Sequence, residues 1–330
     1  MKTALITTTI NRPDVLALYR KHDPDVFFFV VADEKTPSEA YEFCTALENC
    51  KIYSPNQQDR MDFRCSDLLG WNTITRRNIA LLRALAWGAE VIYTIDDDNI
   101  PLSSGYFVFP QQFNGVMVEG DWFDVGQMLD PPVPHRGFPR QVLDQSWRAV
   151  PAVDKKVGVA AGICLGDPDI DAVERMVNHP TVHRVSQLLE SGIIVSPNTK
   201  TVANTQNTSF LRELAPCFLM VPQLGRHDDI LASLVAQRVM HERDLYMHFG
   251  RPFVWQQRNQ HDLLKDLDAE IWGMKYILLF ADVLDAVKLS GVSVIEDCRI
   301  IWSALTSTTW MPGGVRELTE AWLTDCEKVL

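Results

Sequence analysis

The sequence predicts an α/β fold: a mostly parallel central sheet with helices on both faces, followed by a helical appendage at the C-terminus. Two observations support this prediction. Strand-like and helix-like segments alternate through the first hundred residues, and apolar residues recur at helical spacing after about residue 264. Such alternation is typical of a parallel sheet covered by helices. We therefore expect an α/β domain over residues 1–264 and a helical extension over residues 265–330.

The first elements begin directly at the N-terminus. Residues 3–9 (TALITTT) predict a strand, and a helix is expected to follow from Asn11, as its N-cap, to about Arg20. Residues 26–33 (VFFFVVAD) form a continuous aromatic and β-branched run. This composition is typical of a strand that is buried on both faces of a sheet.

The next segments continue the alternation. Residues 36–47 begin with Thr and Pro, as helices often do, and the short run at 51–54 predicts a strand. The segment from residue 75 has one broad apolar face, is expected to end at Gly88, and is followed by a strand to Asp96. Ligands of parallel sheets bind outside the carboxyl ends of the strands. Asp96 stands at such an end.

Three consecutive carboxylates, Asp96, Asp97 and Asp98, follow this apolar strand. Side chains alternate along an extended segment, so Asp96 and Asp98 are expected to face one way and Asp97 the other. Crowded carboxylates are stable as anions only near a cation, and hard oxygen ligands suit Mg²⁺ or Mn²⁺, which also bind substrate phosphates. The triplet predicts either a metal–diphosphate site or a solvated acidic turn.

Composition argues against several other functions. A formal charge of -12 disfavours tight, sequence-blind binding of nucleic acid. The seven cysteines are scattered and lack CxxC spacing, so neither a disulfide framework nor a thiolate zinc site is indicated. No secretory signal and no run of apolar residues long enough for a membrane span is found. These features predict a cytoplasmic protein without a membrane span.

The middle of the chain is rich in Pro and Gly. Residues 130–140 and 160–176 are expected to be loops around a site, with a helix from about Asp169. After residue 264, two stretches with helical spacing predict the C-terminal helices.

Five motifs between about residues 70 and 260 occur in the same order in two groups of enzymes that bind nucleotide sugars. The motifs are TIDDDNIP, PHRGFPR, GDPDIDA, NTQNTSF and GRHDDI. Together they resemble motifs of the plant reversibly glycosylated polypeptides, which act as UDP-arabinopyranose mutases, and of the STELLO-type glycosyltransferases. The helix and strand before the acidic triplet also resemble the corresponding STELLO segment.

This resemblance implies a GT-A fold and a metal-dependent glycosyltransferase. A nucleotide sugar, first of all a UDP-sugar, is the expected donor, and Mn²⁺ or Mg²⁺ the expected cofactor. A pyranose–furanose mutase acting on a UDP-sugar is the alternative enzyme, and a non-catalytic sugar-nucleotide-binding protein is a third alternative. The acceptor, whether a glycan, a protein or a modified nucleic acid, stays open, as does a homo-oligomeric state.

The resemblance also implies roles for individual residues on the donor side. Asp96 and Asp98 match metal-binding positions, His261 is a candidate third metal ligand, and Asp97 is expected to hold sugar or ribose hydroxyls. Arg76 and Arg77 begin a helix, where a cation needs a compensating anion such as a diphosphate, although one of the two is expected to be solvated. The residues expected to hold the nucleotide at the ends of the first two strands are Thr8, Thr9, Asn11 and Asp33.

Arg136 matches the arginine that the mutase group glycosylates reversibly, but its flanking residues differ. A role in donor binding is therefore expected ahead of a role as sugar acceptor, and the alternative is a loop arginine paired with a nearby carboxylate. Either Asp167 or Asp169 is expected to face the donor. Asp171 is expected to serve the local structure.

Asp228 and Asp229 match the second acidic pair of both groups. A carboxylate in this region of a GT-A enzyme takes a proton from the acceptor or binds the sugar hydroxyls, and general-base catalysis needs such a group close to the reacting hydroxyl. The alternative is a helix start with acidic residues in its first turn, which the helix dipole favours.

Overall fold

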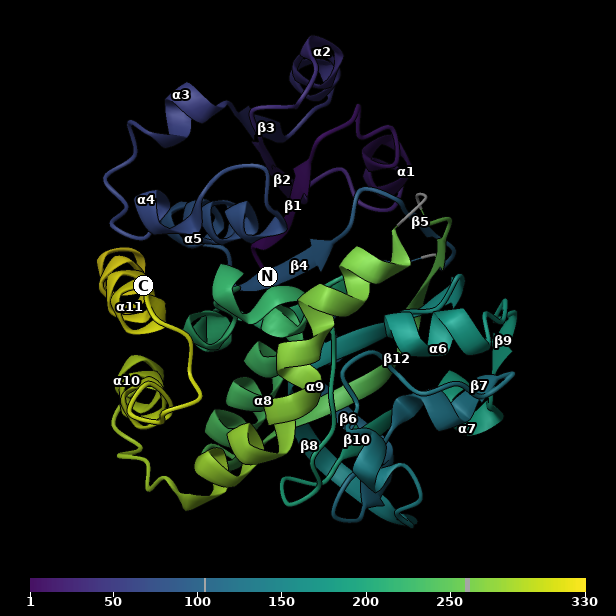
Figure 1. Cartoon of the computed structure of the whole chain (residues 1–330). Coiled ribbons are helices and arrows are strands. Elements are labelled where there is room, and N and C mark those ends of the chain that lie inside the picture. Colours follow the sequence, from purple (N-terminus) through teal and green to yellow (C-terminus); the bar gives the residue numbers. More distant parts are fainter. Residues whose placement is uncertain (104, 259–261) are drawn as a thin grey trace.

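The structure, a computed structural model, describes residues 1–103, 105–258 and 262–330. In these residues a ten-stranded sheet crosses the molecule in the order β3-β2-β1-β4-β11-β8-β6-β10-β12-β5 (Figure 1). The strands of this sheet are β1 (Thr3–Thr9), β2 (Phe27–Ala32), β3 (Cys50–Tyr53), β4 (Val91–Ile95), β5 (Asn99–Pro101), β6 (Gln112–Glu119), β8 (Arg148–Gly166), β10 (Ile193–Val195), β11 (Asn207–Leu211) and β12 (Leu245–Gln256). Two short strands, β7 (Leu129–Asp130) and β9 (Arg184–Val185), pair separately.

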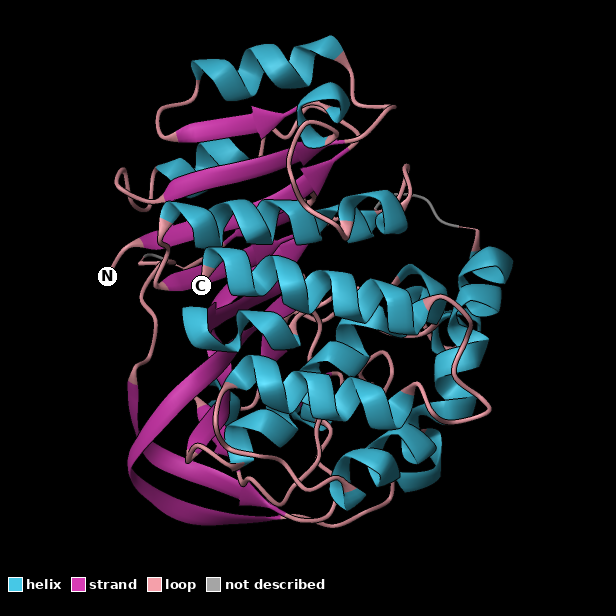
Figure 2. Ribbon diagram, turned by 90° about the vertical axis from the view of Figure 1, so that its left-hand side faces the viewer, coloured by secondary structure: helices cyan, strands magenta, loops and turns pink. Residues whose placement is uncertain are grey.

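Helices surround this sheet and form most of the C-terminal part (Figure 2). The α-helices are α1 (Leu16–Arg20), α2 (Ser38–Ala46), α3 (Pro55–Gln58), α4 (Ser66–Leu69), α5 (Arg77–Trp87), α6 (Ala172–Val177), α7 (Gln187–Glu190), α8 (Asp228–His241), α9 (Leu263–Ala286), α10 (Val294–Leu305) and α11 (Val315–Val329). The 3₁₀ helices are η1 (Ile74–Arg76), η2 (Val125–Met128), η3 (Arg140–Val142), η4 (Arg212–Cys217) and η5 (Pro222–His227).

The N-terminal half of the sheet is parallel. β1 pairs in parallel with β2 and β4, and β2 pairs in parallel with β3, so the carboxyl ends of these strands lie at one edge. β11 then runs antiparallel to β4, with Asn207 opposite Ile95, and the rest of the sheet mixes both directions. The residues just before β11 therefore lie beside those that follow β4.

Alternating side chains explain why both faces of this sheet are covered. On β2, Phe29 and Val31 belong to one buried hydrophobic cluster, and Phe28 and Val30 belong to a second. The first cluster includes residues of α5, α8, α9, α10 and α11, and the second includes residues of α1 and α2. The predicted α/β class, with a central sheet between helices and a helical C-terminal part, is confirmed.

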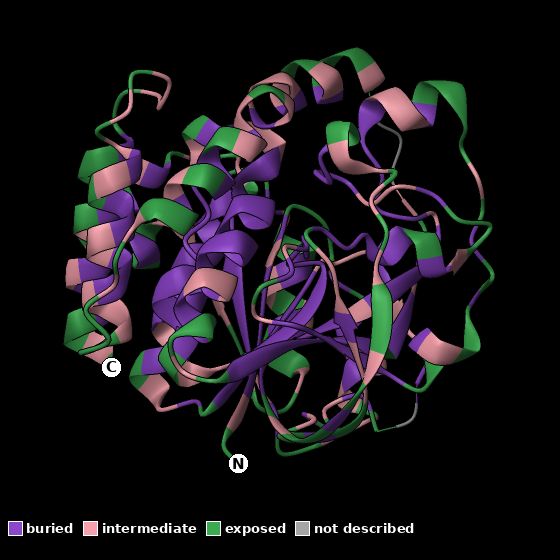
Figure 3. Ribbon diagram, turned by 90° about the horizontal axis from the view of Figure 1, so that it is seen from below, coloured by how far each residue is buried: buried purple, intermediate pink, exposed green. Residues whose placement is uncertain are grey.

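The C-terminal helices pack on the α/β core and expose their outer faces (Figure 3). The indole nitrogen of Trp322 on α11 donates to the carbonyl of Pro216, at 3.0 Å. The buried carboxylate of Asp325 accepts from the backbone nitrogens of Arg64 and Cys65 at 3.0 and 2.8 Å. α11 is therefore bonded to two segments of the core. Among the described helices, none is both long and apolar enough to cross a membrane.

Three local predictions were wrong. The first helix begins at Leu16 instead of Asn11, because Thr9 accepts from the backbone of Asn11 and a turn follows. Residues 160–166 lie in β8 instead of a loop, because this apolar stretch pairs with β11 and β12. The helix expected from Asp169 begins at Ala172, and its N-cap is Asp171, which accepts from the backbone of Glu174 at 2.8 Å.

Candidate active site

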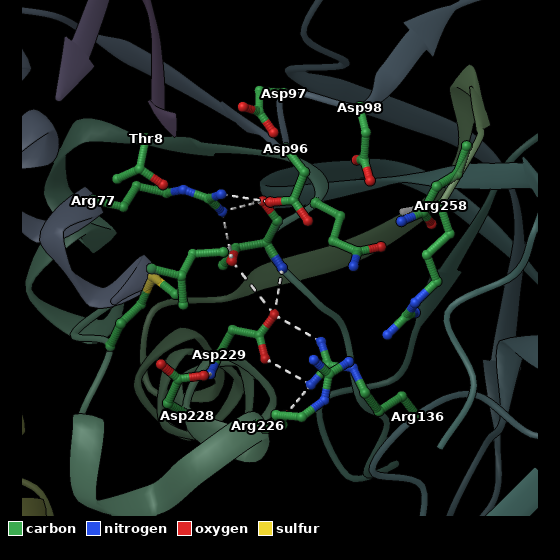
Figure 4. A pocket seen from close by; sticks show the side chains of 15 residues that line it. Thr8, Arg77, Asp96, Asp97, Asp98, Arg136, Arg226, Asp228, Asp229 and Arg258 are labelled. Carbon is green, nitrogen blue, oxygen red and sulfur yellow. Dashed lines mark hydrogen bonds and ion pairs between the residues drawn. The ribbon is translucent and has the colours of Figure 1, made fainter. Parts of the chain in front are cut away.

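A cavity of about 230 Å³ opens beside the carboxyl ends of β1 and β4 and the first turn of α8 (Figure 4). It brings together the acidic triplet and the second acidic pair, which lie about 130 residues apart in the sequence. Main-chain pairing explains this, because the backbone nitrogen of Asp96 donates to the carbonyl of Gln206 at 3.2 Å, just before β11. The labelled residues lining the cavity are Thr8, Arg77, Asp96, Asp97, Asp98, Arg136, Arg226, Asp228, Asp229 and Arg258.

The acidic triplet lies in a turn and not in an extended segment. β4 ends at Ile95, and the backbone nitrogen of Asn99 donates to the carbonyl of Asp96 at 3.3 Å as β5 begins. The predicted alternation was therefore wrong, and Asp96, Asp97 and Asp98 all line the same cavity. The five buried residues of β4 fix the position from which the turn starts.

Asp96 is paired with an arginine of the protein itself. The Nη2 of Arg77, in the first turn of α5, donates to Asp96 Oδ1. The Nη1 of Arg77 lies 3.3 Å from Thr94 Oγ1 and 3.1 Å from the carbonyl of Thr205. The Arg77 side chain is only 3% exposed and that of Asp96 is 17% exposed. Arg77 therefore compensates the charge of Asp96 and fixes its position.

Asp97 and Asp98, unlike Asp96, form no ion pair with an arginine in the part of the chain that the structure describes. Asp97 accepts a hydrogen bond from Thr9, and its pKa is raised because burial outweighs that bond. The Oδ1 of Asp98 is buried, and no donor among the described residues reaches it. Burial, followed by the charges of Asp96 and Asp97, raises the pKa of Asp98 to about 7. Asp98 is thus a half-buried carboxyl group with one oxygen left for a ligand.

A divalent cation fits this turn. Among the described residues, no three His, Cys, Asp or Glu side chains gather as a complete metal site. Mg²⁺ and Mn²⁺ need fewer, because they bind through one or two carboxylates and complete their shell with water and substrate phosphates. The unpartnered oxygen of Asp98 and the partly exposed carboxylate of Asp96 suit such an ion. His261, the candidate third ligand, lies outside the described residues.

The second acidic pair opens α8. Asp229 accepts from Arg136 Nη1 and Nη2 at 3.1 and 3.0 Å, and from the backbone nitrogen of Thr205 at 3.0 Å. Burial raises the pKa of Asp229, but the charge and hydrogen bonds of Arg136 outweigh this and lower it below its usual value. Asp229 is therefore a fixed anion.

Asp228 differs from its neighbour although both line the cavity. Its Oδ1 accepts from the backbone nitrogen of Asp229 at 2.9 Å, and no ion pair between Asp228 and a described residue is found. Burial and then the charge of Asp229 raise the pKa of Asp228 to about 8. A buried carboxyl group with a raised pKa beside a cavity is a candidate for proton transfer.

Arg136 joins two buried carboxylates. Its Nε donates to both oxygens of Asp169, at 2.8 and 3.0 Å, while its two terminal nitrogens donate to Asp229. Burial alone lowers the pKa of the Arg136 guanidinium, but the charges of Asp169 and Asp229 outweigh this and raise it well above its usual value. This is the pairing of a loop arginine with nearby carboxylates that the sequence left open.

The glycine after Arg136 is required by packing. Gly137 has a φ of +77°, and a Cβ there would lie 2.7 Å from Cγ2 of Ile230 on α8. A side chain at this position would meet both backbone strain and a clash. The Arg-Gly pair therefore lets the loop approach the start of α8 closely enough for Arg136 to reach Asp229.

Three of the four residues expected to hold the nucleotide do not line the cavity, and in two of them, Thr9 and Asp33, the protein itself uses the polar groups. Thr9 donates to Asp97. Asp33 accepts from the backbone nitrogens of Asn72 and Thr73 at 2.7 and 3.0 Å, which fixes the loop before η1. Asn11, two residues after β1, is exposed and outside the cavity, whereas Thr8 lines it.

Arg76 and Asp167 also lie away from the cavity. The guanidinium of Arg76 is buried, donates to Gln58 Oε1 at 2.9 and 2.6 Å and to the carbonyl of Ser66, and lies over the ring of Trp71. Arg77 is also buried and is bonded to Asp96. The expectation that one of these two arginines is solvated was therefore wrong. Asp167 pairs with Arg175, so Asp169, through Arg136, is the acid of its motif that is coupled to the site.

The sequence prediction missed several residues that line the cavity. Thr205 and Gln206 belong to NTQNTSF, and Arg226 belongs to GRHDDI, so their motifs were recognised but these members were not. Gln256 and Arg258 also line the cavity, and the only signal that could have found them is their place at or just after the carboxyl end of a strand, β12.

Comparison with known proteins gives distant similarity. No protein-family model matches the chain, and no curated protein matches it significantly. A crystal structure of S. aureus TarS 1–349 in complex with UDP-GlcNAc aligns with a TM-score of 0.39 and 12% identity, over 98% of this chain and 72% of that chain. The same protein in complex with UDP aligns with a TM-score of 0.39 and 13% identity, over 94% and 73%. The site of the present chain is therefore defined by its own residues.

Proposed function

We propose that this protein is a metal-dependent glycosyltransferase whose donor is a nucleotide sugar. A UDP-sugar is the leading candidate. The observation that supports this most is that one cavity contains both the acidic triplet, after β4, and the acidic pair at the start of α8. The resemblance of its five motifs to enzymes that act on nucleotide sugars supplies the substrate class. The acceptor stays open.

The acidic triplet is assigned to the donor complex. Asp98, through its unpartnered oxygen, and Asp96, held by Arg77, would bind Mn²⁺ or Mg²⁺. Such a cation, when bound, supplies positive charge to the departing diphosphate. Asp97 and Thr8 also line the cavity and would contact sugar or ribose hydroxyl groups.

Asp228 is assigned to proton transfer. A general base must be close to the reacting hydroxyl and must have an oxygen that the protein does not already use. Asp229 does not meet the second condition, because Arg136 and Thr205 bond its oxygens. Asp228 lines the cavity and its pKa is about 8 in the free protein, so its ionised form is a strong enough base for an acceptor hydroxyl.

The mutase alternative requires a sugar on Arg136, and the contacts of this residue speak against it. A nitrogen that forms a glycosidic bond needs a free lone pair, which a protonated guanidinium lacks. The two buried carboxylates raise the pKa of Arg136 well above its usual value, although burial lowers it, and they accept hydrogen bonds from Nε, Nη1 and Nη2. Arg136 is therefore proposed to position Asp229 and the start of α8.

Donor consumption tests this proposal. We would incubate the protein with a panel of UDP-sugars and Mn²⁺, and identify products with and without added acceptors. Release of UDP that EDTA abolishes is expected. Isomerised UDP-arabinose without UDP release, together with a glycosyl adduct that Arg136→Lys removes in intact-mass spectra, would favour the mutase instead. No UDP-sugar turned over or bound would contradict the proposal.

A further inference from the structure

The arginines that the sequence offers for a diphosphate are already bonded within the protein. Arg76 donates to Gln58 and Ser66, Arg77 to Asp96 and Thr205, and Arg136 to Asp169 and Asp229. A guanidinium binds phosphate through paired hydrogen bonds, so it must have donors to spare. Among the described residues, Nε of Arg77 is the one buried nitrogen of these three side chains that has no hydrogen-bond partner, whereas Arg76 and Arg136 have none left over.

Arg258 is the exception among the arginines that line the cavity. Its side chain is 6% exposed, and its Nε and Nη1 are buried without an acceptor among the described residues. Its nearest carboxylate contact is Asp266, whose Oδ2 lies 3.7 Å from Nη2. That distance allows an ion pair but exceeds a hydrogen bond.

The carboxylates of the described residues compensate the charge of Arg258 only in part. Burial, followed by the charge of Arg175, lowers the pKa of Arg258. A buried cation with unused donors is costly, because those donors have lost their water and gained no acceptor. Such a group in the wall of a cavity indicates an anionic ligand.

Two other polar atoms without partners lie close to Arg258. The Oε1 of Gln256 and the Oδ1 of Asp98 are buried and have no hydrogen-bond partner in the described parts of the chain. Pairing of β5 with β12 places Gln256 opposite Asn99, the residue after Asp98. Figure 4 shows Arg258 reaching into the cavity from the side on which Asp98 lies. The unsatisfied groups therefore gather at one end of the cavity.

We propose that Arg258 binds the diphosphate of the donor, at the end of the cavity where Asp98 and Gln256 lie. This inference rests on the proposed function for the identity of the anion. Phosphate oxygens would accept from Nε and Nη1 of Arg258, and Asp98 would help to hold the cation that accompanies the diphosphate. Arg258, and not Arg76, Arg77 or Arg136, is then the arginine that neutralises the leaving group.

Calorimetric titration of UDP and of inorganic pyrophosphate, each with Mn²⁺, tests this role. Arg258→Gln is expected to weaken both ligands about tenfold or more, as loss of a charge-assisted hydrogen bond does. Arg258→Lys, which keeps the charge but not the planar fork, is expected to lie between Arg258→Gln and the parent. The matched control is Arg251→Gln on β12, the strand that precedes Arg258, because Arg251 is exposed and pairs with Glu190 away from the cavity.

The outcomes separate the two proposals. Equal affinities of Arg258→Gln and the parent for both ligands would overturn the role of Arg258 and leave the proposed function intact. A loss for UDP but not for pyrophosphate would also overturn it, because Arg258 would then contact the nucleoside. A parent protein that binds neither ligand would contradict the proposed function itself.

Discussion

The two acidic groups of the cavity share one pattern. In each, an arginine neutralises one aspartate, Arg77 for Asp96 and Arg136 for Asp229. Another aspartate of each group has no arginine partner among residues 1–103, 105–258 and 262–330 and has a raised pKa, about 7 for Asp98 and about 8 for Asp228, in both cases chiefly because of burial. The paired acids fix the local structure, and the unpaired acids are left for ligand or substrate.

The difference between the groups lies in how firmly the paired acid is held. Asp96 is bonded by one nitrogen of Arg77 and is 17% exposed. Asp229 is bonded by two nitrogens of Arg136 and by Thr205, and is 7% exposed. Asp96 therefore keeps the capacity to share a cation with Asp98, whereas Asp229 supports only Asp228. This comparison supports the proposed roles, metal binding for the first group and proton transfer for the second.

The largest expected effect follows from removing the arginine of the second group. Arg136→Met should lower the free energy of unfolding by about 3–5 kcal/mol, because Asp169 and Asp229 would remain buried without a cation. Denaturant unfolding measures this. The control Arg148→Met, whose arginine is 78% exposed, should change stability by less than about 1 kcal/mol. Similar losses in the free energy of unfolding for the two variants would show that Arg136 does not stabilise the site.

Removing the unpaired acid of the same group should affect catalysis instead. Asp228→Asn keeps the shape of the side chain, so stability should be maintained, while turnover of the donor should fall roughly a hundredfold or more, the scale of a lost acid or base. Steady-state assays and thermal unfolding of the same sample test this. Turnover at the parental rate would mean that the second acidic pair serves only the start of α8 and not catalysis.

The pH dependence of turnover should report Asp228 directly. Asp228 accepts a proton only when ionised, and its pKa of about 8 means that the ionised fraction falls as the pH falls below that value. Turnover should therefore rise with pH up to about 8, roughly tenfold per pH unit well below it, and then level off. Asp228→Asn should lose this limb. A parent profile that is flat between pH 6 and 9 would argue against proton transfer by Asp228.

Local patterns predicted much of the fold. Continuous apolar runs such as 26–33 predicted buried strands, and the Asp-rich segment after β4 predicted the candidate site. Both patterns can be read from residues that are adjacent in the sequence. The error at residues 160–166 has a physical reason. Gly and Pro nearby suggest loops, but pairing with β11 and β12, which are distant in sequence, makes this stretch a strand.

The same reasoning explains which site residues were predicted and which were not. Residue types and motifs identified Asp96, Asp98 and Asp228 as members of one site. They did not reveal that Arg76 and Arg77 use their donors inside the protein, because Gln58 and Thr205 reach them only after folding. Whether a charge is already paired is a property of the tertiary structure, and this property singles out Arg258.

The metal dependence of UDP binding tests the central assignment most directly. Calorimetric titration of UDP would be carried out with Mn²⁺ and with EDTA on the parent, Asp98→Ala and Asp228→Asn. Mn²⁺ should strengthen UDP binding about tenfold or more in the parent and in Asp228→Asn, because the first acidic group holds the cation. Asp98→Ala should bind UDP equally weakly in both buffers. Equal affinity of the parent for UDP with Mn²⁺ and with EDTA would contradict the account.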